Sequence, residues 1–182
     1  MIAGLARAAA LITAVVIAAL ALGGCFYSDR ELIGFWGADT PLQDGVWVHT
    51  PTHPDGTEWG GFTWRGELRN QRRRYVSNDA NFPHQNARLR QLHEDTYLAQ
   101  FPGEAGYGYG VMFVYAGGAM ASYHMPDCSA LSDAGREETG IAVDGEGYCR
   151  LTSLDQLEAV MRAYLAARAD DLVIDGVYRR ES

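Results

Sequence analysis

The sequence predicts an α+β fold, in which a curved antiparallel β-meander or partly closed barrel-like sheet carries one C-terminal helix packed on it. Three observations support this prediction. Apolar and polar residues alternate in short segments between residues 44 and 125. Turn-forming residues, such as Asp44-Gly45, separate these segments. The apolar period changes to that of a helix only near the C-terminus.

The expected strands of the first half are short. They cover residues 44–50, 58–69, 72–77, 87–92 and 96–101. In the second of them, Phe62, Trp64 and Leu68 share one face, while polar residues occupy the other. That alternation is typical of a strand with one face in the core and one in water.

Residues 107–125 predict a long hairpin folded at Ala116-Gly117-Gly118. Its first arm is apolar on both faces, with alternating aromatic residues on one and glycines, Met112 and Val114 on the other. We therefore expect a central strand that is covered above and below. A tyrosine-rich face of this kind is more often core than a platform for sugars or lipid.

One helix is predicted after residue 152. Ser153 is the expected N-cap, and Gln156 three residues later completes a capping box. The apolar stripe that follows has helical spacing and consists of Leu154, Leu157, Val160, Met161, Tyr164 and Leu165. A last strand is expected over residues 172–180. Residues 127–149 lack periodicity and are expected to form a loop.

The first 24 residues have the parts of an export signal. One positive charge at Arg7 precedes an apolar core over residues 8–22, and two glycines follow. The core is shorter than the roughly 20 apolar residues that span a bilayer. We expect a signal peptide over 1–24, a tether over 25–33 and a single globular domain over 34–182.

The quartet Leu22-Gly23-Gly24-Cys25 resembles the lipobox of bacterial lipoproteins. The resemblance implies a diacylglyceryl group on Cys25, cleavage before it and a further acyl chain such as palmitate. It places the protein in the bacterial cell envelope, lipid-anchored and facing the periplasm. Phe26 in the second mature position favours the outer over the inner membrane. An ordinary secreted protein with a buried or free Cys25 is the alternative.

The remaining two cysteines are expected to form a disulfide. With Cys25 assigned to lipid, Cys128 and Cys149 are left as a pair in an oxidising compartment. Neither belongs to a CxxC motif, which argues against a metal site or a catalytic thiol.

A basic segment lies within an acidic chain. Between residues 65 and 90 only Glu67 and Asp79 oppose seven arginines, although the whole chain has a net charge of −8. The predicted anion-binding residues are Arg65, Arg69, Arg72, Arg73, Arg74, Arg88 and Arg90. An envelope protein or an anionic glycan or lipid would suit them, and nucleic acid would not in this compartment. Pairing of these arginines with acids of the same protein is the alternative.

No motif in the chain specifies a reaction. The sequence contains no nucleophile elbow, zinc-protease helix or phosphate-binding loop. We expect no cofactor and a non-catalytic binding or scaffold module. The alternative is an envelope hydrolase or metal-dependent enzyme that uses the loop of His49 and His53, where Asp55 would complete a zinc or copper site.

Overall fold

The computed structural model describes residues 26–53, 56–103, 106–145, 147–169 and 171–181. It confirms the predicted α+β fold. The strands are β1 (Phe26–Ser28), β2 (Gly45–Pro51), β3 (Trp64–Gln71), β4 (Arg74–Ser77), β5 (Arg88–His93), β6 (Thr96–Gly103), β7 (Gly106–Tyr115), β8 (Met120–His124), β9 (Cys149–Arg150) and β10 (Gly176–Arg180). The helices are α2 (Asp133–Thr139) and α3 (Leu154–Ala167), with 3-10 turns η1 (Phe35–Gly37), η2 (Ala116–Gly118) and η3 (Cys128–Ala130).

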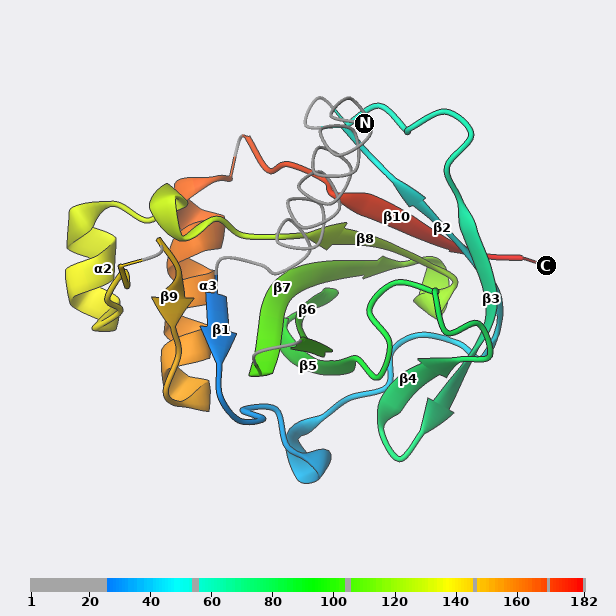
Figure 1. Cartoon of the computed structure of the whole chain (residues 1–182), viewed down its shortest axis with the longest axis horizontal. Helices are drawn as coiled ribbons and strands as arrows, with labels where there is room; N and C mark the ends of the chain where they lie inside the picture. The colour runs from blue at the N-terminus through cyan, green and yellow to red at the C-terminus, as the bar shows by residue number, and fades with distance from the viewer. Residues whose placement is uncertain (1–25, 54–55, 104–105, 146, 170, 182) are drawn as a thin grey trace, which may run out of the picture.

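Eight of the strands curve round a common interior (Figure 1). Antiparallel pairing runs in the order β5, β6, β7, β8, β10, β2, β3 and β4. The sheet is not closed. Between its two end strands, β4 and β5, the described residues form an isolated bridge of Tyr75 with Ala87 and no continuous ladder. This is the partly closed form of the predicted architecture.

The central strand β7 has two neighbours along one edge. Its C-terminal half pairs with β8, and its N-terminal half pairs with β1, which in turn pairs in parallel with β9. Along the other edge of β7, the residues from Gly106 to Phe113 pair with the whole of β6. β7 is therefore paired along both edges, which makes it a central strand of the sheet, as predicted.

Two apolar cores form on the two faces of the sheet. The first lies against α3 and includes Tyr109 and Val111 of β7, so the tyrosine-rich face serves mainly as core. The second fills the interior of the curved sheet, and nearly every strand contributes to it: Trp47, Leu68, Tyr75, Leu89, Ala99, Phe101, Met112, Val114, Ala121, Tyr123 and Tyr178.

The helix α3 begins as predicted, whereas α2 was not expected. The Ser153 side chain caps α3 by accepting a hydrogen bond from the backbone N–H of Gln156. In α2, Ser132 is the N-cap and Gly140 ends the helix in the left-handed conformation. No residue of α2 is buried, so the helix has no apolar stripe that periodicity could detect.

The expected tether differs from the structure. Phe26, the residue that follows Cys25, belongs to β1 and is fully buried, and Ile33 is fully buried as well. Three residues are too few to show an alternating pattern, which explains why the strand was not predicted. Cys25 and the expected signal peptide lie outside the described residues.

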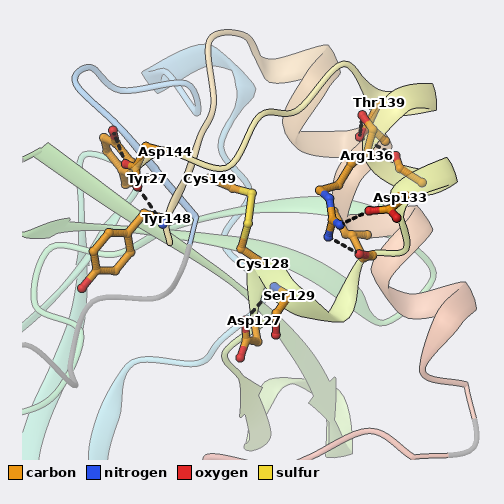
Figure 2. The surroundings of a disulfide bond; sticks show 12 residues. Tyr27, Asp127, Cys128, Ser129, Asp133, Arg136, Thr139, Asp144, Tyr148 and Cys149 are labelled. Carbon is orange, nitrogen blue, oxygen red and sulfur yellow. Dashed lines mark hydrogen bonds and ion pairs between the residues drawn. A yellow bond between two sulfur atoms is a disulfide. The ribbon is translucent and has the colours of Figure 1, made fainter. Parts of the chain in front are cut away.

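The predicted disulfide between Cys128 and Cys149 is confirmed. Their Cα atoms are 5.8 Å apart, and both residues are fully buried in the core against α3. In Figure 2, Tyr27 and Tyr148 lie on one side of the bond and α2 residue Arg136 on the other. The bond thus fastens the segment that contains α2 to strand β9.

Candidate functional site

The turn between β3 and β4 has an unusual sequence. Arg72 and Arg73 are its two central residues, with Gln71 opposite Arg74 in the hairpin register. Both have positive φ, 53° and 60°, as a type I′ turn requires. Asn-Gly is the favoured pair there, because a left-handed backbone costs other residues roughly 1–2 kcal/mol each. Strain of this kind is typical of functional positions.

Arg73 connects this turn to η1. Its guanidinium donates to the carbonyl oxygen of Ala38 at 2.6 Å and lies 5.5 Å from the ring centroid of Phe35. Phe35 in turn packs edge-to-face on Trp36, with 4.9 Å between ring centroids. Figure 1 shows the blue η1 segment and the β3–β4 turn at the same lower end of the molecule. We call Phe35, Trp36, Arg72 and Arg73 the basic tip.

The basic tip exposes both an aromatic ring and free positive charge. Trp36 is 87% exposed, the largest value among the exposed large apolar residues of the described chain. Arg72 forms no ion pair or side-chain hydrogen bond with the part of the chain that the structure describes. Neither Arg72 nor Arg73 pairs with a described carboxylate. The tip therefore offers guanidinium groups to an external anion.

The other five predicted arginines pair with acids of the same chain. Arg65 donates to Glu181 at 2.7 Å, Arg69 to Glu67 at 2.5 Å and Arg90 to Glu158 at 2.8 Å. Arg74 and Arg88 share the carboxylate of Glu31. The structure thus groups Arg72 and Arg73 at one end and disperses the others over the sheet.

These pairs differ in exposure. The side chains of Arg65 and Arg69 are 63% and 61% exposed, so their ion pairs are held in water and are weak. Hydrogen bonds to Glu181 and Glu67 raise the pKa of each guanidinium. Arg88 is buried instead, and its charge depends on Glu31. Arg65 and Arg69 could exchange partners, whereas Arg88 serves the fold.

The two histidines of the alternative site have different surroundings. His49 is a buried residue of β2, its ring lies against Tyr178, and burial lowers its pKa to about 4. The ring of His53 lies instead beside Trp59. Asp55 lies outside the described residues. Within the described chain, no group of three or more histidine, cysteine or acidic side chains is placed to hold a metal ion.

His84 enters the interior of the curved sheet from the segment between β4 and β5. Its ring contacts Tyr123 at 4.2 Å and Phe101 at 4.9 Å between centroids, and its Nδ1 is hydrogen-bonded to the Tyr178 hydroxyl. Burial, and then the nearby His49, lower its pKa to about 3. A cavity of about 30 Å³ remains beside it, which is too small for an organic ligand.

Sequence reasoning did not pair Ser122 with His124. The Ser122 hydroxyl lies 2.9 Å from His124 Nε2, and His124 Nδ1 lies 2.7 Å from the Val173 carbonyl oxygen. The carbonyl requires an Nδ1–H donor, so Nε2 accepts from Ser122. Both residues are at most 5% exposed, and these contacts satisfy a buried histidine. Because they are successive residues on one face of β8, strand periodicity was the available signal.

The comparisons with known proteins give no family. The chain matches no protein-family model, and neither curated proteins nor solved structures show significant similarity to it. No helix of the described residues has the length and apolar character needed to cross a membrane. The function is therefore inferred from the residues themselves, and above all from the basic tip.

Proposed function

We propose that the protein is a non-catalytic lipoprotein of the bacterial cell envelope whose domain binds an anionic envelope component or partner through the basic tip. One observation carries the binding part of this proposal. Arg72 and Arg73 occupy a turn that disfavours arginine and have no described carboxylate partner, and Arg73 lies over Phe35, which packs on the exposed Trp36. A turn with a purely structural role would gain stability from asparagine and glycine.

The anchor is argued from the sequence. The quartet 22–25 follows a signal-like apolar core, and lipid on Cys25 would hold the domain on the periplasmic side of a membrane. Phe26 in the second mature position favours the outer over the inner membrane. A disulfide between Cys128 and Cys149 is compatible with such an oxidising compartment.

The ligand chemistry follows from the guanidinium group. Its planar set of donors matches phosphate and carboxylate, which it can bind through two parallel hydrogen bonds. In an envelope these groups occur on phospholipids, on glycans and on acidic proteins. Arg72 is the residue that is free to turn toward such a group, because Arg73 is held by Ala38 and Phe35.

The proposal is tested on the full-length protein purified from membranes in mild detergent. Intact mass gives the modification of Cys25, and retention on immobilised phospholipid, lipopolysaccharide and peptidoglycan fragments gives binding. We expect a lipidated mass, retention on at least one anionic matrix, weaker retention for Arg72→Glu and a smaller loss of retention for Arg72→Lys, which keeps the charge but not the planar set of donors.

Each part of the proposal can fail separately. An unmodified Cys25 contradicts the anchor, and equal retention of the wild type and Arg72→Glu contradicts binding at the tip. A stoichiometric metal ion in the native mass spectrum would instead favour the metal-dependent alternative at His49 and His53. Arg72→Lys is the matched control, since it keeps the charge and the left-handed backbone.

A further inference from the structure

The basic tip is ordered by a chain of contacts. The Arg73 guanidinium is held by the Ala38 carbonyl and covers Phe35, and Phe35 packs on the edge of Trp36. Trp36 is thus exposed yet supported from one side. Because the support is already formed, little side-chain freedom is lost when Trp36 contacts a partner.

This combination of residues suits the surface of a bilayer. Tryptophan is enriched at membrane interfaces, where its ring lies at the level of the headgroups. Arginine near an anionic leaflet is attracted to the headgroup phosphates. Trp36 projects from a short 3-10 turn, so a ring at this position can enter a soft headgroup layer. A rigid small ligand would instead require a concave site.

The attachment point leaves the tip within reach of the membrane. Phe26, directly after Cys25, is fully buried between β7 and β9, so lipid on Cys25 has no spacer before the folded domain. Trp36 is ten positions after Phe26 in the chain, which limits the distance between them to about 35 Å. Contact of the tip with the same bilayer is then an intramolecular event, for which modest intrinsic affinity is enough.

We infer that the basic tip is a second membrane contact, in which Trp36 enters the headgroup layer of an anionic bilayer while Arg72 binds a phosphate and the Arg73 guanidinium, held by Ala38, adds positive charge. The inference rests on the proposed function, because it takes lipid on Cys25 as the first contact. Two contacts fix the orientation of the domain, whereas a lipid alone leaves it free to rotate.

The test uses the full-length lipidated protein in vesicles that contain brominated phospholipid, with and without phosphatidylglycerol. Bromine quenches tryptophan emission only within the bilayer. We expect quenching of the wild type in anionic vesicles, and loss of the quenched component in Trp36→Phe. Arg72→Asn should lower the equilibrium constant for insertion of the tip, obtained from the quenched fraction, about fivefold, as expected for the loss of one basic contact.

Trp59→Phe is the matched control. Trp59 is 46% exposed and lies before the start of β3, whereas the turn of Arg72 and Arg73 follows the end of this strand. β3 has eight residues and is about 25 Å long, so Trp59 and the turn of Arg72 and Arg73 follow on from opposite ends of this strand. Removal of Trp59 should therefore leave the quenched component intact.

The outcomes separate this inference from the proposed function. If Trp36→Phe and the wild type are quenched equally, the tip does not enter the bilayer and the inference is wrong. Retention of the protein on peptidoglycan or on lipopolysaccharide, with loss in Arg72→Glu, would then leave the proposed function standing with a glycan as ligand. An unlipidated protein would contradict the anchor and this inference, which depends on it, whereas binding at the tip would still be decided by the retention of Arg72→Glu.

Discussion

The guanidinium of Arg73 lies 5.5 Å from the centroid of the Phe35 ring and joins two segments that are 38 residues apart in the sequence. The contact unites a charged hairpin turn with an aromatic 3-10 turn. Neither segment alone would form a site, because the turn lacks an apolar surface and η1 lacks charge. Their union creates the basic tip on which the functional proposal depends.

The first prediction concerns the conflict between stability and binding at the turn. Arg72→Asn should raise the free energy of unfolding by about 1 kcal/mol, because asparagine tolerates the left-handed backbone better than arginine. The substitution removes no described side-chain contact of Arg72. Urea denaturation of the wild type and the variant measures the change.

Arg72→Lys serves as the control for this prediction. Lysine keeps the charge and the same backbone strain, so its stability should equal that of the wild type within about 0.5 kcal/mol. A destabilised Arg72→Asn protein would show that the arginine side chain supports the fold. The strained backbone at Arg72 would then no longer indicate a binding role.

The second prediction concerns Glu31, which serves both Arg74 and Arg88. Glu31→Gln should lower the free energy of unfolding by about 3 kcal/mol, because it leaves the buried guanidinium of Arg88 without an opposing charge. Glu158→Gln removes the partner of Arg90, whose side chain is more exposed than that of Arg88, and should cost about 1 kcal/mol or less. Equal losses in the two variants would show that burial of Arg88 is unimportant.

The third prediction concerns the disulfide. Replacing both Cys128 and Cys149 by alanine should cost about 3 kcal/mol, because the bond restricts a 21-residue separation in the unfolded chain. Cys25→Ser should leave this part of the stability unchanged. Denaturation of the three proteins with and without reductant distinguishes the effects, and reductant should affect only the proteins that keep the bond.

Local patterns were sufficient for much of the fold. The hairpin of β7 and β8 and the helix α3 follow from periods of two and 3.6 over ten residues or more, together with the Ser153 cap. The pattern was less reliable where glycines interrupt it. Phe62 was expected to face the core, but β3 begins only at Trp64, and Phe62 is 56% exposed.

Elements without a pattern could not be predicted. The strand β1 has three residues and depends on partners in β7 and β9, which are far away in the sequence. The helix α2 is polar on all sides, although Ser132 and Gly140 signal its two ends. Both elements depend on contacts with segments far away in the sequence, which a local sequence pattern does not reveal.

The site shows the same limit. The sequence located the basic segment but not the acids that pair with it, because Arg65–Glu181 and Arg90–Glu158 join residues 116 and 68 positions apart. Only the fold reveals that Arg72 and Arg73 lack a described carboxylate partner. Trp36 gave no signal, since a single aromatic residue in an irregular segment carries no periodicity.

The fourth prediction concerns acid stability. Burial lowers the pKa of His49 to about 4 and that of His84 to about 3, whereas both titrate near 6.5 in the unfolded chain. Below pH 6.5 the unfolded state therefore binds more protons than the native state, so the free energy of unfolding decreases as the pH is lowered. Between pH 7 and pH 5 the two histidines together should cost about 4 kcal/mol.

Urea midpoints at pH 7, 6 and 5 measure this loss. His49→Leu should remove about half of it, because leucine has no proton to bind and the His49 Nδ1 has no hydrogen-bond partner in the described chain that would be lost. The remaining half belongs to His84, whose protonation would place a cation against Tyr123 and Phe101 within the sheet. If the free energy of unfolding is the same at pH 7 and pH 5, the prediction is wrong. Both imidazoles would then be in contact with water in the native state, and solvent would enter the interior of the sheet near the segment between β4 and β5.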